Sequence, residues 1–300
     1  MVLSRGKGLN RLSVNDWAPA LEAKLNTELS RYYAQPTQIT AVEPLEAGLT
    51  NRCLRLTDSQ GGLAVWRPNS EAVRAFDIDR SREASAQSLV ANHGLARQPV
   101  ALLDEGLLVP WVPGQPLDQC NDDHTAILID LLARIHQLPV EIETASVDAQ
   151  CQHYERQLSL TCKQQLEEVK GWVNAQRPAA EGEKRVVCHM DLGAYNIVIT
   201  PTREAVVLDW EYARTADAHL DIALFCRANA LQPDAVIETY CAQQQIKATE
   251  AVRRRVLAWL PFADYLALCW YEVGANLYRL PAYKEAANQL FEQLAAQRRG

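Results

Sequence analysis

Long apolar runs and closely spaced cysteine pairs are missing from this sequence of 300 residues. No stretch approaches the roughly 20 apolar residues of a membrane-spanning helix, and the most apolar segment, residues 256–271, contains Pro261 and Asp264. The 8 cysteines include no Cys-x-x-Cys pair, which argues against zinc and redox motifs. No apolar run follows the basic N-terminal residues, so a secretory signal is not expected. These absences predict a cytoplasmic protein with reduced thiols and no membrane insertion.

An excess of basic residues is missing as well, because 30 Lys and Arg stand against 37 Asp and Glu, for a formal net charge of -7. Broad nucleic-acid binding relies on neutralising phosphates, so this balance predicts no nucleic-acid partner. The charge balance still allows a local basic pocket that binds a small phosphate ligand. The sequence also lacks Gly-x-Ser-x-Gly and Gly-x-Gly-x-x-Gly, the signatures of a serine nucleophile and of a dinucleotide-binding fold. The sequence does not distinguish a monomer from a homodimer.

Apolar periodicity divides the chain into two unequal parts. The first part is expected to contain a helix at 12–33, strands at 39–44, 51–56 and 63–67, a helix at 80–93, and strands at 100–104 and 107–112. Three prolines and a glycine in residues 110–116 predict a stiff connector. Beyond it, helices are expected at 124–137, at 149–174 and from about 231 onward, with strand-like runs in 185–210. The prediction is an α+β fold with an N-lobe at 1–109, a hinge at 110–116 and a helical C-lobe at 117–300.

A polar loop lies between two apolar runs of the helical part and contains His189, Asp191 and Asn196, and Asp209 ends the next apolar run. A single Asp at a strand end is usually a turn residue or a helix cap. The ordered set, however, repeats the spacing of the protein-kinase catalytic loop and metal aspartate. Phosphoryl transfer needs one carboxylate to accept a hydroxyl proton, here Asp191, and oxygen ligands for Mg²⁺, here Asn196 and Asp209.

Two segments, Cys188-His-Met-Asp-Leu-Gly-Ala-Tyr-Asn196 and Val207-Leu-Asp-Trp-Glu-Tyr-Ala213, carry a family resemblance. From about residue 40 to 275 the chain resembles the aminoglycoside phosphotransferase and choline kinase superfamily, whose fold is protein-kinase-like with two lobes. The second segment is similar to bacterial thiamine kinases and to choline or ethanolamine kinases. The resemblance implies ATP and Mg²⁺ as cofactors and thiamine as the leading acceptor, followed by choline or ethanolamine and then an aminoglycoside. It also implies that His189 organises the catalytic loop and that Asp221 begins a helix supporting it.

The same resemblance implies a set of nucleotide-binding residues. They are Gly48, Thr50 and Asn51 in a loop between two strands, Arg67 on a strand, Glu83 as its ion-pair partner, and the backbone of Pro110 and Val112. From the residues alone, an ordinary hairpin turn fits the single-glycine loop as well. Arg67 could equally be a surface arginine, because the register of its strand is uncertain by one residue. Glu83 could equally be a solvated side chain on its helix.

The acceptor is expected beyond the catalytic loop, where aromatic and acidic residues accumulate between 259 and 272. Candidate contacts are Glu211, Tyr265, Trp270 and Glu272, although Trp270 shares a helical face that is most simply core. Aromatic rings and carboxylates attract a quaternary nitrogen, so a small, cationic primary alcohol fits this mixture. A kinase-like module that binds nucleotide without turnover is the alternative. The complete His-Asp-Asn-Asp set argues against that module, and the weak phosphate loop keeps it open.

Overall fold

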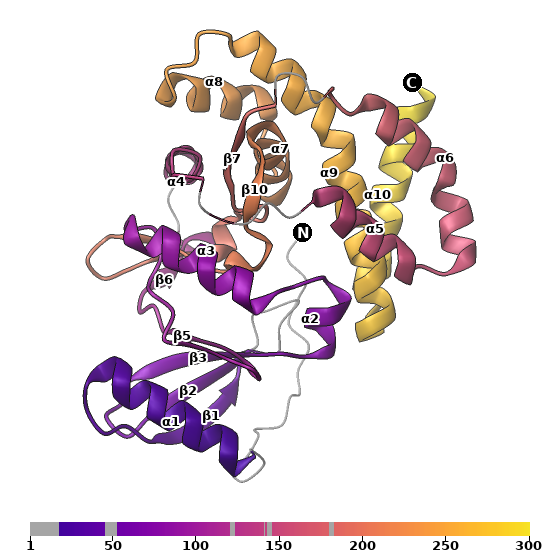
Figure 1. Ribbon diagram of the computed structural model, residues 1–300. Helices are drawn as coiled ribbons and strands as arrows, with labels where there is room; N and C mark the ends of the chain where they lie inside the picture. The colour runs from indigo at the N-terminus through magenta and orange to yellow at the C-terminus, as the bar shows by residue number, and fades with distance from the viewer. Residues whose placement is uncertain (1–17, 46–52, 121–123, 141, 143–145, 180–182) are drawn as a thin grey trace.

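The protein is described by a computed structural model that covers residues 18–45, 53–120, 124–140, 142, 146–179 and 183–300. The expected nucleotide-loop residues Gly48, Thr50 and Asn51 lie outside these ranges. A sheet-rich N-terminal part and a mainly helical C-terminal part are visible in Figure 1. The α+β class predicted from the sequence is therefore confirmed.

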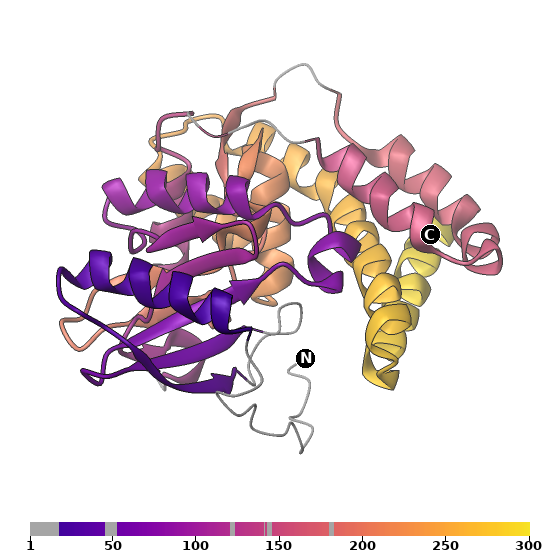
Figure 2. The same ribbon diagram turned by 60° about the horizontal axis from the view of Figure 1, so that its bottom comes forward.

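The N-terminal part is built on an antiparallel sheet of five strands in the order β1-β2-β3-β5-β4. The strands are β1 (Ile39–Pro44), β2 (Leu54–Asp58), β3 (Leu63–Pro68), β4 (Ala101–Leu103) and β5 (Gly106–Pro110). Asp58 forms the turn between β2 and β3, because its Oδ1 accepts the N–H of Gly62 at 2.8 Å. Helix α1 (Pro19–Tyr33) lies across the sheet (Figure 2) and buries Leu25 and Leu29 in one apolar cluster with Trp66 of β3.

Helix α3 (Arg80–Asn92) lies between the sheet and the C-terminal part, as Figure 1 shows. The helix begins at Asp79, whose carboxylate accepts the N–H of Ser81 at 2.8 Å, as expected of an N-cap residue. The chain leaves the helix through Gly94, whose φ of +73° is the left-handed conformation that glycine adopts without strain. The short helix α2 (Glu71–Ala75) precedes α3 and was not predicted, since five residues carry too little periodicity.

Two small sheets frame the polar loop of the C-terminal part. Strand β7 (Arg185–Cys188) pairs with β10 (Arg214–Asp217), and β6 (Gln115–Pro116), β8 (Ile197–Ile199) and β9 (Ala205–Val207) form a sheet in the order β6-β8-β9. The loop at 189–196 connects β7 to β8, and the segment at 208–213 connects β9 to β10. Because β8 and β9 are antiparallel neighbours, with Ile197 opposite Val207, the residues just before β8 and just after β9 lie at the same end of this sheet.

Helices make up most of the C-terminal part. They are α4 (Thr125–Ile135), α5 (Val147–Gln157), α6 (Leu160–Gln176), α7 (Ala218–Ala228), α8 (Pro233–Gln243), α9 (Thr249–Tyr278) and α10 (Pro281–Arg299). The single helix expected at 149–174 is wrong, because the chain becomes extended at Leu158. Ser159 then starts a new helix by accepting the N–H of Cys162 at 3.1 Å.

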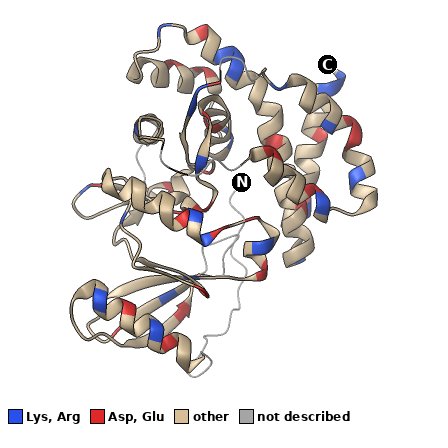
Figure 3. Ribbon diagram, in the orientation of Figure 1, with Lys and Arg blue, Asp and Glu red and all other residues tan. Residues whose placement is uncertain are grey.

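Helix α9 is the centre of the C-terminal packing, since α5, α6, α7, α8 and α10 all contact it. It contains the most apolar segment of the sequence, which is buried through residues such as Val256, Phe262 and Leu266. In the part of the chain that the structure describes, no helix is both long and apolar enough to cross a membrane. Basic and acidic residues are interspersed over both parts of the molecule (Figure 3).

Candidate active site

The polar loop after β7 is held at its start by Asp221, which lies in the first turn of α7. Its carboxylate accepts the backbone N–H of His189 at 3.1 Å and that of Met190 at 2.8 Å. Met190 has a φ of +69°, a left-handed conformation that is uncommon outside glycine and that these hydrogen bonds help to maintain. Asp221 does not begin the helix, however: the N-cap is Asp217, whose Oδ1 accepts the N–H of His219 at 3.2 Å.

The imidazole of His189 is fully buried and both of its nitrogens have partners. Nε2 lies 3.0 Å from the carbonyl oxygen of Leu208, and Nδ1 accepts the N–H of Asp191 at 3.3 Å. These partners assign the proton to Nε2. Burial lowers the pKa of His189, so the ring is neutral. His189 therefore ties the catalytic loop to the segment that carries Asp209, and it has no free nitrogen to act as a base.

Asp191 is half-buried and both of its carboxylate oxygens accept hydrogen bonds. Tyr195 donates its hydroxyl to Oδ1 at 2.5 Å, and the amide nitrogen of Asn196 lies 3.2 Å from Oδ2 and 2.9 Å from the backbone carbonyl oxygen. Burial raises the pKa of Asp191 to about 7 and outweighs the opposing hydrogen bond from Tyr195, and the nearby charge of Asp209 adds to the rise. A carboxyl group with this pKa is matched to accepting a proton near neutral pH.

The raised pKa of Asp191 predicts a titration that can be observed directly. In the nucleotide-free protein, one aspartate carboxyl should lose its proton at about pH 7, so the group is ionised above that pH and neutral below it. NMR of the aspartate side-chain carboxyl carbons measures the midpoint, and Asp191→Asn should remove this titration alone. A midpoint near the ordinary value of about 3.9 would contradict the burial argument.

Arg67 of β3 connects the N-terminal sheet to the catalytic segments. Its Nε lies 2.7 Å from Glu83 Oε1, and its Nη2 lies 2.5 Å from Asp209 Oδ1 and 2.9 Å from Glu211 Oε2. Burial by itself would lower the pKa of Arg67, but Asp209 and Glu83 hold that pKa well above its ordinary value. The side chain thus points inward, which resolves the uncertainty in the strand register and excludes a surface arginine.

A second arginine completes this ionic cluster. Arg80, in the first turn of α3, lies 2.5 Å from Glu83 Oε2 and 3.3 Å from Glu211 Oε2. The cluster therefore combines two arginines with the three carboxylates of Glu83, Asp209 and Glu211, for a net charge of one negative unit when all five are ionised. Glu83, Arg80 and Glu211 are almost completely buried, whereas the Asp209 side chain is 28% exposed. The member of the cluster that reaches solvent is thus a carboxylate, that of Asp209.

Removing a buried member of this cluster should destabilise the protein. Glu83→Ala leaves two buried arginines without the carboxylate between them, and breaking a buried pair in this way costs about 3–5 kcal/mol. Urea unfolding at neutral pH measures the loss. Glu204→Ala, at the exposed ion pair with Arg97, is the matched control and should change stability by about 0–1 kcal/mol. Equal stabilities for the two variants would contradict the structural role of Glu83.

The backbone candidates for nucleotide contact lie beside a small apolar cluster. Pro110 is the last residue of β5 and pairs with Ala64 of β3. Val112 packs with Val198 of β8 and Val206 of β9, and Leu208 is partly buried against the three. Apolar side chains of the connector and of the small sheet therefore meet close to the catalytic loop.

The four candidate acceptor contacts are not brought together by the structure. Glu211 is buried in the ionic cluster, Tyr265 donates to Glu155 at 2.8 Å, Trp270 donates to Tyr212 at 3.0 Å, and Glu272 lies 2.5 Å from Lys284. Trp270 is the one that belongs to a larger aromatic group, because its ring lies 5.0 Å from that of Phe76 and 5.1 Å from that of Tyr271. Arg227 lies 6.0 Å from the Tyr271 ring, and it precedes by two residues Asn229, whose side chain bonds the catalytic loop at Leu192 and Ala194.

Three residues near the catalytic loop were missed in the sequence. Arg80 has a local signal, since it precedes Glu83 by one helical turn. Tyr195 lies inside the loop motif at 188–196, but the spacing of that motif predicts no function for it. Asn229, at the end of α7, accepts the N–H of Ala194 at 3.0 Å and donates to the carbonyl oxygen of Leu192 at 2.8 Å. Nothing local in the sequence identifies Asn229, because its partners in the catalytic loop are more than thirty residues away.

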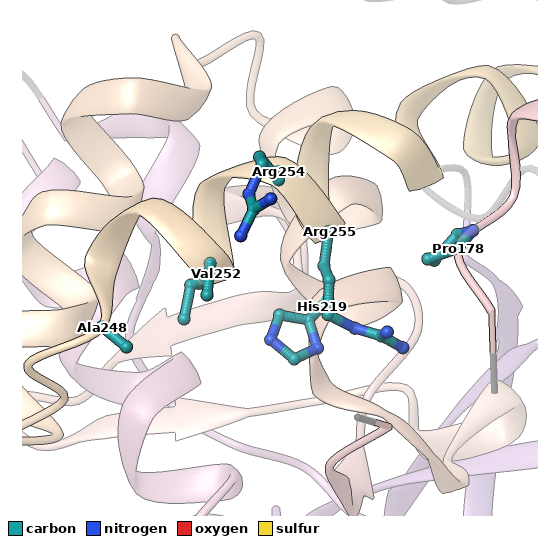
Figure 4. A pocket seen from close by; sticks show the side chains of 7 residues that line it. Pro178, His219, Ala248, Val252, Arg254 and Arg255 are labelled. Atoms are coloured by element: carbon teal, nitrogen blue, oxygen red, sulfur yellow. The ribbon is translucent and has the colours of Figure 1, made fainter. Parts of the chain in front are cut away.

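A hollow of about 440 Å³ lies on the C-terminal part, away from these residues. Its lining includes Pro178, His219, Val252, Arg254 and Arg255 (Figure 4). Beside it, Asp217 accepts hydrogen bonds from His219 Nδ1 at 2.6 Å and from Trp259 and Arg255, each at 2.9 Å. Although burial opposes it, these donors hold the pKa of Asp217 well below its usual range. The contacts fasten α9 to the strand that precedes α7, which is a structural role.

The chain belongs to the phosphotransferase enzyme family, because the sequence model of that family matches residues 41–259. It is a small-molecule phosphotransferase. The thiamine kinase of Escherichia coli O17:K52:H18 is 24% identical over 272 residues, which cover 89% of this chain and 91% of that protein. An aminoglycoside 3'-phosphotransferase of Streptomyces ribosidificus is 27% identical over 189 residues, which cover 56% of this chain and 71% of that one.

Solved structures agree on the fold. The choline kinase LicA from Streptococcus pneumoniae superimposes with a TM-score of 0.69 at 16% identity, covering 92% of this chain and 99% of that chain. A choline/ethanolamine kinase family protein from Mesorhizobium loti gives a TM-score of 0.63 at 19% identity, covering 86% and 87%. The two-lobed, protein-kinase-like architecture implied by the family resemblance is thereby confirmed.

Proposed function

We propose that this chain transfers the γ-phosphate of ATP to a primary alcohol, with thiamine as the leading acceptor. The observation that carries the proposal is the arrangement around Asp191. A carboxylate with a raised pKa is oriented by the Asn196 amide, and the Arg67–Asp209 pair lies on the neighbouring segment. Acid–base, metal-binding and phosphate-binding groups are thus supplied by adjacent segments, which is what phosphoryl transfer requires.

In this mechanism, Asp191 accepts the proton of the acceptor hydroxyl as its oxygen attacks the γ-phosphorus. The new O–P bond forms while the bond from phosphorus to the β-phosphate oxygen breaks, and ADP leaves. Asn196 keeps the carboxylate in orientation through Oδ2. His189 contributes by fixing the backbone of the loop through its two hydrogen bonds. Catalysis in this class rests on positioning and electrostatics more than on covalent chemistry.

The residues present suit a magnesium ion. The amide nitrogen of Asn196 is engaged by Asp191, which leaves its oxygen as the coordinating group, and the exposed carboxylate of Asp209 is a second hard oxygen donor. The ionic cluster and Asp191 together carry more carboxyl groups than arginines, so a divalent cation would be attracted to them and would favour their ionised forms. When bound with ATP, the ion neutralises charge on the phosphates.

For the nucleotide, we assign the adenine to the apolar cluster formed by Val112, Val198 and Val206. The carbonyl of Pro110 and the N–H of Val112 are the backbone groups that would bond the base, and Pro110 needs no donor for this pose. Residues 110–116 then act as the hinge between an N-lobe at 1–109 and a C-lobe at 117–300. Arg67, held by Glu83, would steady the phosphates together with Gly48, Thr50 and Asn51.

Support for a cationic acceptor comes from the aromatic group around Trp270 and Tyr271, because ring faces attract quaternary nitrogen. Of the other candidate contacts, Tyr265 and Glu272 stay predictions, and Glu211 is better placed for the nucleotide side. Thiamine leads because the thiamine kinase match extends over most of both chains. Choline or ethanolamine is second, favoured by the fold similarity to choline kinases, and an aminoglycoside third.

An acceptor panel tests the proposal. ADP release is measured with MgATP alone and then with thiamine, choline, ethanolamine or an aminoglycoside, and the product is identified by mass spectrometry. Thiamine-dependent ADP release with a phosphorylated thiamine is the expected result. Turnover with a different alcohol would keep the kinase reaction and replace thiamine as its acceptor. No acceptor-dependent turnover with any of the four would favour a nucleotide-binding module and overturn the proposal.

A further inference from the structure

The hydroxyl of Tyr195 lies where the proposed reaction needs the hydroxyl of the acceptor. It donates to Asp191 Oδ1 at 2.5 Å, and Oδ2 of the same carboxylate faces the amide of Asn196. Oδ1 is therefore the carboxylate oxygen turned away from the expected metal ligand. An acceptor alcohol would have to donate to Asp191 in the same way, because the base accepts the hydroxyl proton. A phenol O–H and an alcohol O–H are equivalent donors for this purpose.

Gly193 gives independent evidence that this position of Tyr195 is built into the loop. A Cβ on Gly193 would lie 2.1 Å from Cε1 of the Tyr195 ring and 2.4 Å from Cζ, far inside contact distance. The backbone of Gly193 itself does not demand glycine, since its φ is -104° and its ψ is 158°, values open to any residue. The missing side chain is thus needed by the tyrosine ring, which occupies that space.

The Tyr195 ring can also move away from Asp191. Tyr195 is 47% exposed, although it lies in the middle of an otherwise buried loop. Within the described part of the chain, its hydroxyl has one hydrogen-bond partner, Asp191. A single hydrogen bond and a solvent-facing ring make a reversible contact.

We propose that Tyr195 is a place-holder that occupies the acceptor's position on Asp191 until the acceptor displaces it. The inference rests on the proposed function, because it takes Asp191 as the base. Its consequence is protection of ATP: while the phenol is on Oδ1, its hydroxyl and ring occupy the position from which a water would donate to that oxygen. If water could, its oxygen would attack the γ-phosphorus, the bond to the β-phosphate oxygen would break, ADP would leave, and the water proton would pass to Asp191.

Two variants test the place-holder through different residues. Tyr195→Phe removes the hydroxyl, and Gly193→Ala pushes the ring away while keeping the hydroxyl. Both should raise acceptor-free hydrolysis of MgATP, by roughly tenfold or more, the scale set by one hydrogen bond to a charged group. Tyr32→Phe, at an exposed tyrosine of α1, is the matched control and should hydrolyse ATP at the wild-type rate. A loss of folding alone would lower hydrolysis and would not raise it.

Combining Tyr195→Phe with Asp191→Asn should return hydrolysis to the wild-type background or below, since the base is then missing. Crystals of nucleotide-free Gly193→Ala should have the Tyr195 hydroxyl outside hydrogen-bond distance of Asp191. Hydrolysis that stays at the wild-type level in either single variant overturns the place-holder, as does an unmoved ring. If the wild-type protein phosphorylates an alcohol while these variants change nothing, only the place-holder fails. A wild-type protein that phosphorylates none of the four alcohols overturns the proposed function.

Discussion

Asp191→Asn lowers the rate of phosphoryl transfer by about 10²–10⁴-fold, the contribution typical of a general base, while ATP binding stays nearly intact. The substitution keeps the shape of the side chain and the contacts to Tyr195 and Asn196 can be partly retained. What is lost is the ability to accept a proton. Steady-state kinetics with the acceptor identified by the panel, together with calorimetric titration of ATP, separate the two effects.

The control for this variant is Asp130→Asn, at a surface carboxylate of α4 that forms an exposed pair with Arg134. It should leave both rate and binding at wild-type values. Undiminished turnover in Asp191→Asn would remove Asp191 as the base and with it the mechanism. A large loss of ATP binding would instead mean that Asp191 acts on the nucleotide side of the site.

Asp209→Ala abolishes the magnesium-dependent part of ATP binding. Asp209 is the exposed carboxylate of the ionic cluster and, with Asn196, one of two proposed oxygen ligands. Loss of a supporting group outside the metal's ligands typically weakens metal binding by about 10–100-fold, so loss of a ligand should cost at least as much. Calorimetric titration of ATP with and without MgCl₂ measures the effect, and the two affinities should become equal in the variant.

Asp234→Ala is the matched control, because that aspartate is exposed on α8 and pairs only with Arg253 among the contacts given by the structure. Its magnesium dependence should be that of the wild type. Since Asp209 also holds Arg67 in place, thermal unfolding must accompany the titration. Magnesium-dependent binding at wild-type strength in a folded Asp209→Ala protein would contradict the metal role.

The fold class and the catalytic segment could be predicted because their signals are local. Asp191 and Asn196 precede β8, Asp209 follows β9, and these two short strands pair with each other, so sequence spacing translates into proximity. The break between α5 and α6 was missed because Ser159 is an ordinary polar residue until it caps a helix. Asp217 rather than Asp221 begins α7, and a difference of one helical turn lies within the usual error of sequence-based boundaries.

The parts of the site that could not be predicted depend on contacts between residues far apart in the sequence. The partner of Arg67 on the catalytic segment, Asp209, is 142 residues away, and Glu211 is 144 residues away. No periodicity connects such positions, so the burial of Glu211 in an ionic cluster was not foreseeable and it was assigned to the acceptor. The role of Tyr195 is hidden for the opposite reason. It lies four residues from Asp191, but only the folded loop brings its hydroxyl to the carboxylate.

The central claim is that Asp191 enables transfer of the γ-phosphate to a small alcohol. Phosphorus NMR of the wild-type protein and Asp191→Asn, each with MgATP and thiamine, tests it most directly. We expect a phosphate-ester signal that grows in step with ADP for the wild type, and neither signal growing above background for the variant. Equal ester formation by both proteins would contradict the claim, and so would a wild type that forms ADP and free phosphate but no ester with thiamine or any other alcohol of the panel.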